Sequence, residues 1–173
     1  MKAAAARVAL VAHHEAGHAV AAFALHRRFK RVTIMPGDSS GGHIAIFSAG
    51  SSRTTPAIAH RNAVCALAGP AAQRRFSPHS FRHFHGSDDW CSAQDYAFSL
   101  GGETKTIIAQ LVLWEQRAKD LVNGRWAQIE KVARALIERR TLTYEQFCNL
   151  LVPPVLQAVI DEIVVRSTKV SAG

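Results

Sequence analysis

The chain has 173 residues, of which 48% are hydrophobic and 20% are charged. That length fits one domain with a proper core, and the composition excludes a disordered chain. The net charge of +8 suggests affinity for anions only weakly. Because the arginines are scattered and no basic run alternates with aromatic residues, we expect a solvated basic surface and no nucleic-acid site.

The cysteines and the apolar segments bear on the cellular compartment. Cys65, Cys91 and Cys148 are odd in number, far apart and without a CxxC pair, which argues against a disulfide framework and a cysteine-based zinc site. The natural compartment is then the reducing cytoplasm. Arg7 interrupts the Ala-rich start, so we interpret that segment as a first helix and not as a signal peptide. No run of eighteen uncharged apolar residues predicts a membrane span, and no P-loop motif is present.

Periodicity, caps and breakers predict the elements in chain order. Two β-branched stretches joined by a Gly-rich turn favour a hairpin, which needs a helix to pack on. Gly69-Pro70 lies inside a helical pattern and is expected to kink or split that helix. The predicted elements are a helix over 4–25, strands over 30–35 and 43–47, a helix over 56–76 capped by Thr54 or Thr55, a loop over 77–86, a helix from 87 to the glycines at 101–102, helices over 104–122 and 125–139, a short helix from Thr141 or Thr143 to 151, and a last helix over 155–165.

The first helix carries the sequence His14-Glu15-Ala16-Gly17-His18, an HExxH motif. Two histidines four residues apart lie on one face of a helix, where both imidazoles can reach one tetrahedral metal ion, usually zinc. Glu15 follows the first ligand and can act as general base toward a metal-bound water. The small residues beside the ligands allow a neighbouring segment or a substrate to approach the helix closely.

A catalytic zinc site needs a third protein ligand. The metzincin pattern requires a histidine ten residues after His14, where the chain has Ala24, so that class is excluded. No glutamate occurs between residues 20 and 102, which leaves Asp88 or Asp89 at the start of a later helix. An aspartate there can also simply cap the helix. The loop histidines could also bind the metal, but because zinc needs only one more ligand we favour a polar loop; they are His79, His83 and His85.

These motifs resemble, in their order along residues 10–150, the peptidase domain of the FtsH family of AAA proteases. The resemblance rests on the HExxH motif, on Gly86-Ser87-Asp88-Asp89 with Ala93, and on softer matches. The softer matches are Val32–Pro36, Gly41-Gly42, Leu67–Gln73, Ala133–Glu138 and Thr141-Leu142. In that family a Ser-Asn-Asp sequence supplies the third ligand, so the resemblance implies zinc held by His14, His18 and Asp89, with Asp88 in place of the asparagine. Gln73 and Arg74 replace the family's acidic residues.

The fold class that we predict is mainly α: one helical domain over 1–173, with a core of about 4–165 and a small β-hairpin beside the metal-binding helix, as in FtsH peptidase domains. The implied function is a zinc-dependent endopeptidase with one zinc ion and Glu15 as the base. It acts on peptides or unfolded protein segments without an ATPase motor of its own, and an extended peptide can add to Val32–Met35 or to the strand that starts at His43. A homo-oligomer and a separate ATPase partner both stay open.

Two other classes compete with the peptidase. The first is a non-catalytic binding or regulatory module that keeps the fold and the metal, against which the intact Glu15 argues because such a module has no need for a base. The second is a nucleic-acid-associated protein, suggested by charge alone.

Overall fold

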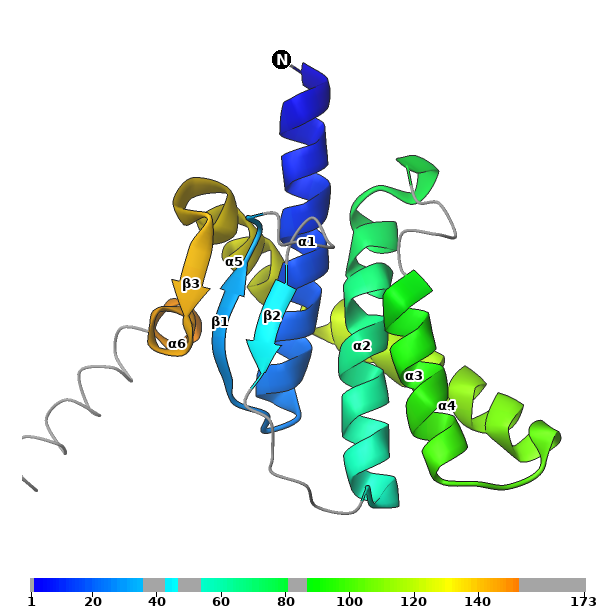
Figure 1. Ribbon diagram of the computed structural model, residues 1–173. Coiled ribbons are helices and arrows are strands. Elements are labelled where there is room, and N and C mark those ends of the chain that lie inside the picture. Colours follow the sequence, from blue (N-terminus) through cyan, green and yellow to red (C-terminus); the bar gives the residue numbers. More distant parts are fainter. Residues whose placement is uncertain (1, 36–42, 47–53, 81–86, 153–173) are drawn as a thin grey trace, which may run out of the picture.

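The HExxH motif lies on a long helix, α1 (Lys2–Ala24), at the centre of the molecule (Figure 1). The computed structural model describes residues 2–35, 43–46, 54–80 and 87–152. A small sheet lies on one side of α1 and α2 (Pro56–Phe76) on the other. Alanines dominate the buried face of α1, so neighbouring elements can approach its backbone closely.

The sheet has three antiparallel strands in the order β2-β1-β3. β1 (Phe29–Thr33) pairs with β2 (His43–Ile46), so the predicted hairpin beside the motif helix is confirmed. β1 also pairs with β3 (Thr141–Thr143), a strand that the sequence did not predict. Val32 lies opposite Ile44 on one side and Leu142 on the other, which makes β1 the central strand.

Helix α2 begins as its sequence predicts. The Thr55 side chain accepts a hydrogen bond from the Ile58 N–H, and Pro56 occupies the first turn, where its missing N–H costs nothing. The helix is not split at Pro70, so that part of the prediction is wrong. Proline removes one backbone hydrogen bond, but α2 is buried on both sides of it, and this packing holds the helix together.

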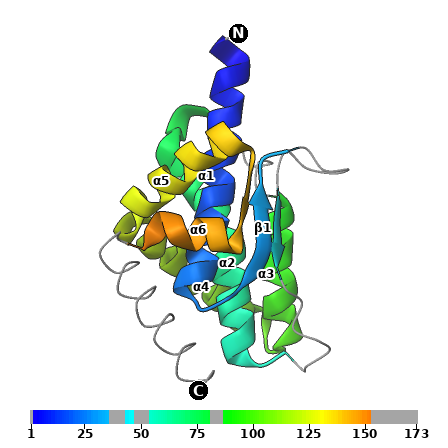
Figure 2. The same cartoon turned by 90° about the vertical axis from the view of Figure 1, so that its left-hand side faces the viewer.

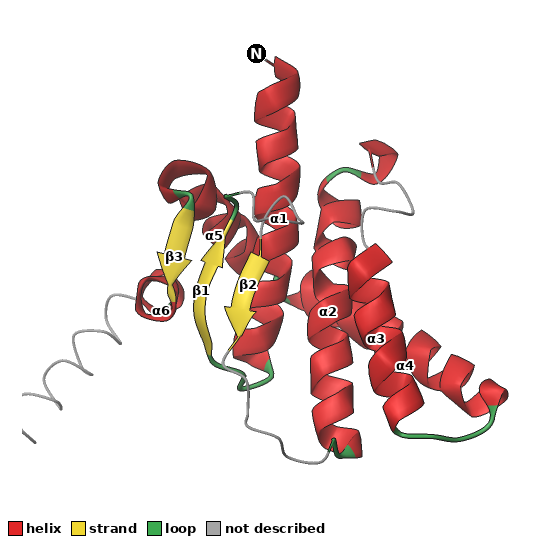
Figure 3. Cartoon of the chain, viewed as in Figure 1, coloured by secondary structure: helices red, strands yellow, loops and turns green. Residues whose placement is uncertain are grey.

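The remaining helices match the predicted ones closely, and the mainly α fold with a small hairpin is confirmed (Figure 3). α6 starts with a capping box in which Thr143 and Gln146 bond each other's backbone N–H groups. The predicted helix over 155–165 lies outside the described residues. The bounds are η1 (Pro78–Ser80), α3 (Ser87–Ser99), α4 (Thr104–Gly124), α5 (Trp126–Arg139) and α6 (Tyr144–Leu151).

Two apolar cores meet along α2. The first lies between α1, the sheet, α5 and α6, and Figure 2 shows α5 and α6 in front of α1. The second lies between α2, α3 and α4 around the buried Trp114. α2 contributes Cys65 and Ala68 to the first core and Val64 and Leu67 to the second, so it connects the two. None of the described helices has the length and apolar character needed to cross a membrane.

Candidate metal centre

Three potential metal ligands converge between α1 and α3. His14 and His18 lie one helical turn apart on α1, and their Nε2 atoms are 3.0 Å from each other. Asp89, in the first turn of α3, places Oδ2 at 3.2 Å from His14 Nε2 and Oδ1 at 3.3 Å from His18 Nε2. The structure therefore brings together the two histidines of the motif and the aspartate that the family resemblance selected.

The separations between the ligand atoms suit one small cation. Zinc with bonds of about 2.0–2.1 Å in tetrahedral geometry sets its ligand atoms about 3.3 Å apart. The observed separations are 3.0, 3.2 and 3.3 Å. Two imidazole nitrogens and one carboxylate also form a donor set that zinc accepts. The residues present thus fit a zinc ion in both spacing and chemistry.

Hydrogen bonds on the far side of each ring set its orientation. His14 Nδ1 donates to Gln73 Oε1 at 3.0 Å, and His18 Nδ1 donates to the backbone carbonyl of Cys65 at 2.8 Å. With each Nδ1 donating to its acceptor, the Nε2 atoms point toward each other and toward Asp89, where they can share a proton or bind a cation. Such outer hydrogen bonds are the usual companions of metal-binding histidines.

The charges at the centre are strongly coupled. Burial alone lowers the pKa of His18, but Asp89, Glu15 and the Cys65 carbonyl outweigh it and raise that pKa to about 9. Burial alone raises the pKa of Asp89, but His18 and His14 hold it well below its usual range. The Asp89 carboxylate is therefore negatively charged, and the space between it and the two histidine rings favours a positive charge. In the metal-free protein a proton on His18 provides that charge, and a bound cation would replace it.

Glu15, the candidate base, is deeply buried beside these ligands. The residue is only 4% exposed, and its charge is one of the causes, after Asp89, that raise the pKa of the His18 ring. The ligands are more open, since the side chains of His14 and Asp89 are 16% and 23% exposed. Glu15 is therefore buried next to a cluster whose His14 and Asp89 side chains are partly exposed.

Two glycines allow α1 and α2 to meet at this centre. A Cβ on Gly17 would lie 2.6 Å from the Ala68 carbonyl oxygen, and a Cβ on Gly69 would overlap the His18 ring. The close approach to α1 that the sequence predicted is therefore made by α2. It places the Cys65 carbonyl and Gln73 within hydrogen-bond distance of the two histidines.

The other candidate residues are not part of this cluster. Asp88 is exposed, and His79 is exposed in η1. His83, His85 and the side chain of His43 lie outside the described residues. His13, next to the motif, stacks on Phe76 with ring centroids 3.7 Å apart, so it belongs to the packing of α1.

Sequence reasoning missed the residues that support the ligands. Gln73 attracted notice only as a departure from an acidic family residue, and nothing suggested that it bonds His14. A backbone carbonyl such as that of Cys65 leaves no signal in residue type. The Ala-Gly-Pro sequence around Gly69 hinted at a special backbone, but a broken helix explained it equally well.

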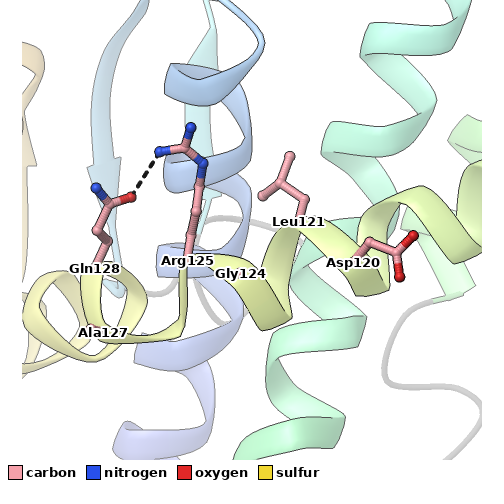
Figure 4. Close-up of a pocket in the computed structure, with 6 residues that line it drawn as sticks. All are labelled: Asp120, Leu121, Gly124, Arg125, Ala127 and Gln128. Atoms are coloured by element: carbon pink, nitrogen blue, oxygen red, sulfur yellow. Dashed lines mark hydrogen bonds between the residues drawn. The ribbon is translucent and has the colours of Figure 1, made fainter.

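A separate hollow lies at the junction of α4 and α5 (Figure 4). Its volume is about 380 Å³, and Arg125 in its wall donates to Gln128 Oε1 at 3.1 Å. None of the three ligands lines it. The lining residues are Asp120, Leu121, Gly124, Arg125, Ala127 and Gln128.

Comparison with known proteins gives no assignment for this chain. No protein-family model matches the sequence, and no curated protein matches it.

Proposed function

We propose that this protein is a zinc-dependent endopeptidase resembling the FtsH peptidase domain, with His14, His18 and Asp89 as metal ligands. The observation that carries the proposal is the meeting of Asp89 with both histidines, across about seventy residues of chain, next to the buried Glu15. A metal-containing binding module accounts for the ligands as well, but such a module does not need a general base and so gives no chemical role to the buried carboxylate of Glu15.

The roles of the residues follow from their positions. Bound zinc supplies a Lewis acid that polarises a peptide carbonyl and makes an attacking water molecule more acidic. His14 and His18 offer Nε2, held in direction by Gln73 and the Cys65 carbonyl. Glu15 accepts the proton of the water at a carboxylate oxygen and passes it to the leaving amine.

The sheet suggests how an extended substrate binds. β1 is paired on both sides, so the expectation that a peptide adds to Val32–Met35 is wrong for the paired part of that segment. β2 pairs with β1 along one side and packs beside α1 (Figure 1). In that view it is the strand nearest α2 and α3. We therefore assign peptide binding by strand addition to the outer edge of β2, and the substrate class to unfolded or extended segments.

The metal is tested first, by elemental analysis of the purified protein. We expect about one zinc per chain, lost in Asp89→Ala and retained in the matched variant Asp88→Ala. Circular dichroism of both variants checks that they fold. Zinc retained in Asp89→Ala but lost in Asp88→Ala would refute the ligand set, and a wild-type protein that binds no zinc would refute the site.

Catalysis is tested separately, with casein and a quenched fluorescent peptide library. Glu15→Gln should keep its zinc and lose activity by a factor of about 100 or more, the usual contribution of a general base. The exposed Glu138→Gln serves as the matched control and should behave as wild type. If wild type and Glu15→Gln contain zinc and neither cleaves, the peptidase proposal fails and the binding module takes its place.

A further inference from the structure

One face of α4 is apolar and exposed. Ile108, Val112 and Leu113 are 54%, 60% and 50% exposed, which is unusual for side chains of this kind. The opposite face of the same helix packs into the second core through Trp114 and Ala118. α4 is thus already anchored on one side, and the exposed side chains have no role in the fold of the described residues.

The charges on this face have a particular order. Lys105 lies near the start of the helix and Asp120 near its end, and no charged residue lies between Lys105 and Glu115. Lys119 also falls on this side of the helix, but its ammonium group is paired with Glu115 Oε1 at 2.8 Å. The Gln116 amide donates to Asp120 Oδ1 at 2.8 Å and holds that carboxylate on this side of the helix. At about 100° per residue, both charged residues lie on the same arc as Ile108, Val112 and Leu113.

This order is unfavourable for a lone helix. The helix dipole favours acidic residues in the first turn and basic residues in the last, and α4 has neither. Around the midpoint between Val112 and Leu113, however, Lys105 and Asp120 are symmetric, each about 11 Å along the axis at about 1.5 Å per residue. Two copies of α4 packed antiparallel about that midpoint would place each lysine opposite the aspartate of the other copy.

We propose that this face, Lys105 to Asp120 of α4, is a self-association surface that pairs with the same face of a second copy of this chain. The pair is antiparallel and two-fold symmetric, with Val112 and Leu113 at its centre and the Lys105–Asp120 contacts at its ends. The helix dipoles then oppose each other, which is favourable. One helix pair is a small interface, so the dimer dissociates on dilution.

The first experiment measures the mass of the full-length chain by light scattering and by sedimentation over a wide range of protein concentration. Wild type should shift from monomer to dimer as the concentration rises. Val112→Glu should stay monomeric at every concentration with an unchanged circular dichroism spectrum. Met35→Glu, at an equally exposed apolar residue outside α4, is the matched control and should dimerise as wild type. A wild-type protein that is monomeric at the highest concentration overturns the proposal.

A charge swap tests the antiparallel register. Lys105→Glu and Asp120→Lys each place like charges at both ends of the pair and should weaken dimerisation at least tenfold. The double variant restores opposite charges and should recover most of the wild-type affinity. A double variant no better than the single ones overturns the register. None of these variants touches the metal ligands, so the result is independent of the zinc content and of any peptidase activity.

Discussion

At the scale of single residues, the candidate metal centre includes an amide, Gln73, that lies against the outer nitrogen of His14. Gln73 Oε1 accepts a hydrogen bond from His14 Nδ1–H, which leaves Nε2 of that ring as the atom that would bind a metal. Gln73 is 7% exposed, so water cannot easily take its place. An amide accepts this hydrogen bond without adding a negative charge, whereas a glutamate would also make the ring more basic.

Replacing Gln73 should therefore change zinc affinity without removing a ligand. Gln73→Leu leaves the His14 Nδ1 proton without its acceptor and should weaken zinc binding about 10- to 100-fold. Gln73→Glu restores an acceptor and adds charge, so its affinity should equal or exceed that of wild type. Titration against a chromophoric chelator measures both, with the exposed Gln94→Leu as control. Unchanged affinity in Gln73→Leu would contradict the role of this hydrogen bond.

Residue type alone could narrow the third ligand to two aspartates, but it could not identify the supporting role of Gln73. Exclusion by residue type led to Asp88 or Asp89, and the structure places Asp89 at the histidines. Residue type could not separate the two, because adjacent positions at a helix start differ by about 100° in direction. Gln73 could not be found by type at all, since its role depends on how closely α2 approaches α1.

At the scale of elements, the close contact of α1 and α2 is what forms the site. The helices of the fold were predictable because each has an amphipathic pattern or a cap, as Thr55 and Thr143 show. β3 was not, since Thr141–Thr143 is too short to show a strand pattern and its threonines are also good helix caps. Only pairing with β1 makes this segment a strand.

Because α1 and α2 are in close contact, replacing a glycine by alanine at that contact should have the opposite effect on stability from the same replacement elsewhere. Gly17→Ala introduces a Cβ at 2.6 Å from the Ala68 carbonyl oxygen, so it should destabilise the protein by about 1–3 kcal/mol through overpacking. Gly124→Ala, at the end of α4, meets no atom within 4 Å and should stabilise it by about 0.5–1 kcal/mol, because alanine is the better helix former. Urea unfolding measures both free energies. Equal effects of the two substitutions would show that helix propensity, and not the α1–α2 contact, dominates at Gly17.

At the scale of the whole molecule, the three residues of the candidate metal centre come from two cores. His14 and His18 belong to α1 in the first core, whereas Asp89 belongs to α3, which packs mainly on α2 and α4 in the second. The first turn of α3 is thus tied to α1 through Asp89. A metal ion bound by all three residues would add a cross-link between parts of the protein that α2 otherwise connects.

Removal of the metal should therefore loosen one defined region and lower the stability of the whole. At free zinc a thousandfold above its Kd, binding contributes about 4 kcal/mol, or roughly 10 °C in Tm for a protein of this size. Chelation with EDTA should remove that stabilisation and speed hydrogen exchange at the start of α3 more than in α5. Asp89→Ala should have the lower Tm from the outset and respond little to EDTA, whereas Asp88→Ala should respond as wild type does. An EDTA effect of equal size in Asp89→Ala would mean that the ion binds elsewhere and does not join the two cores.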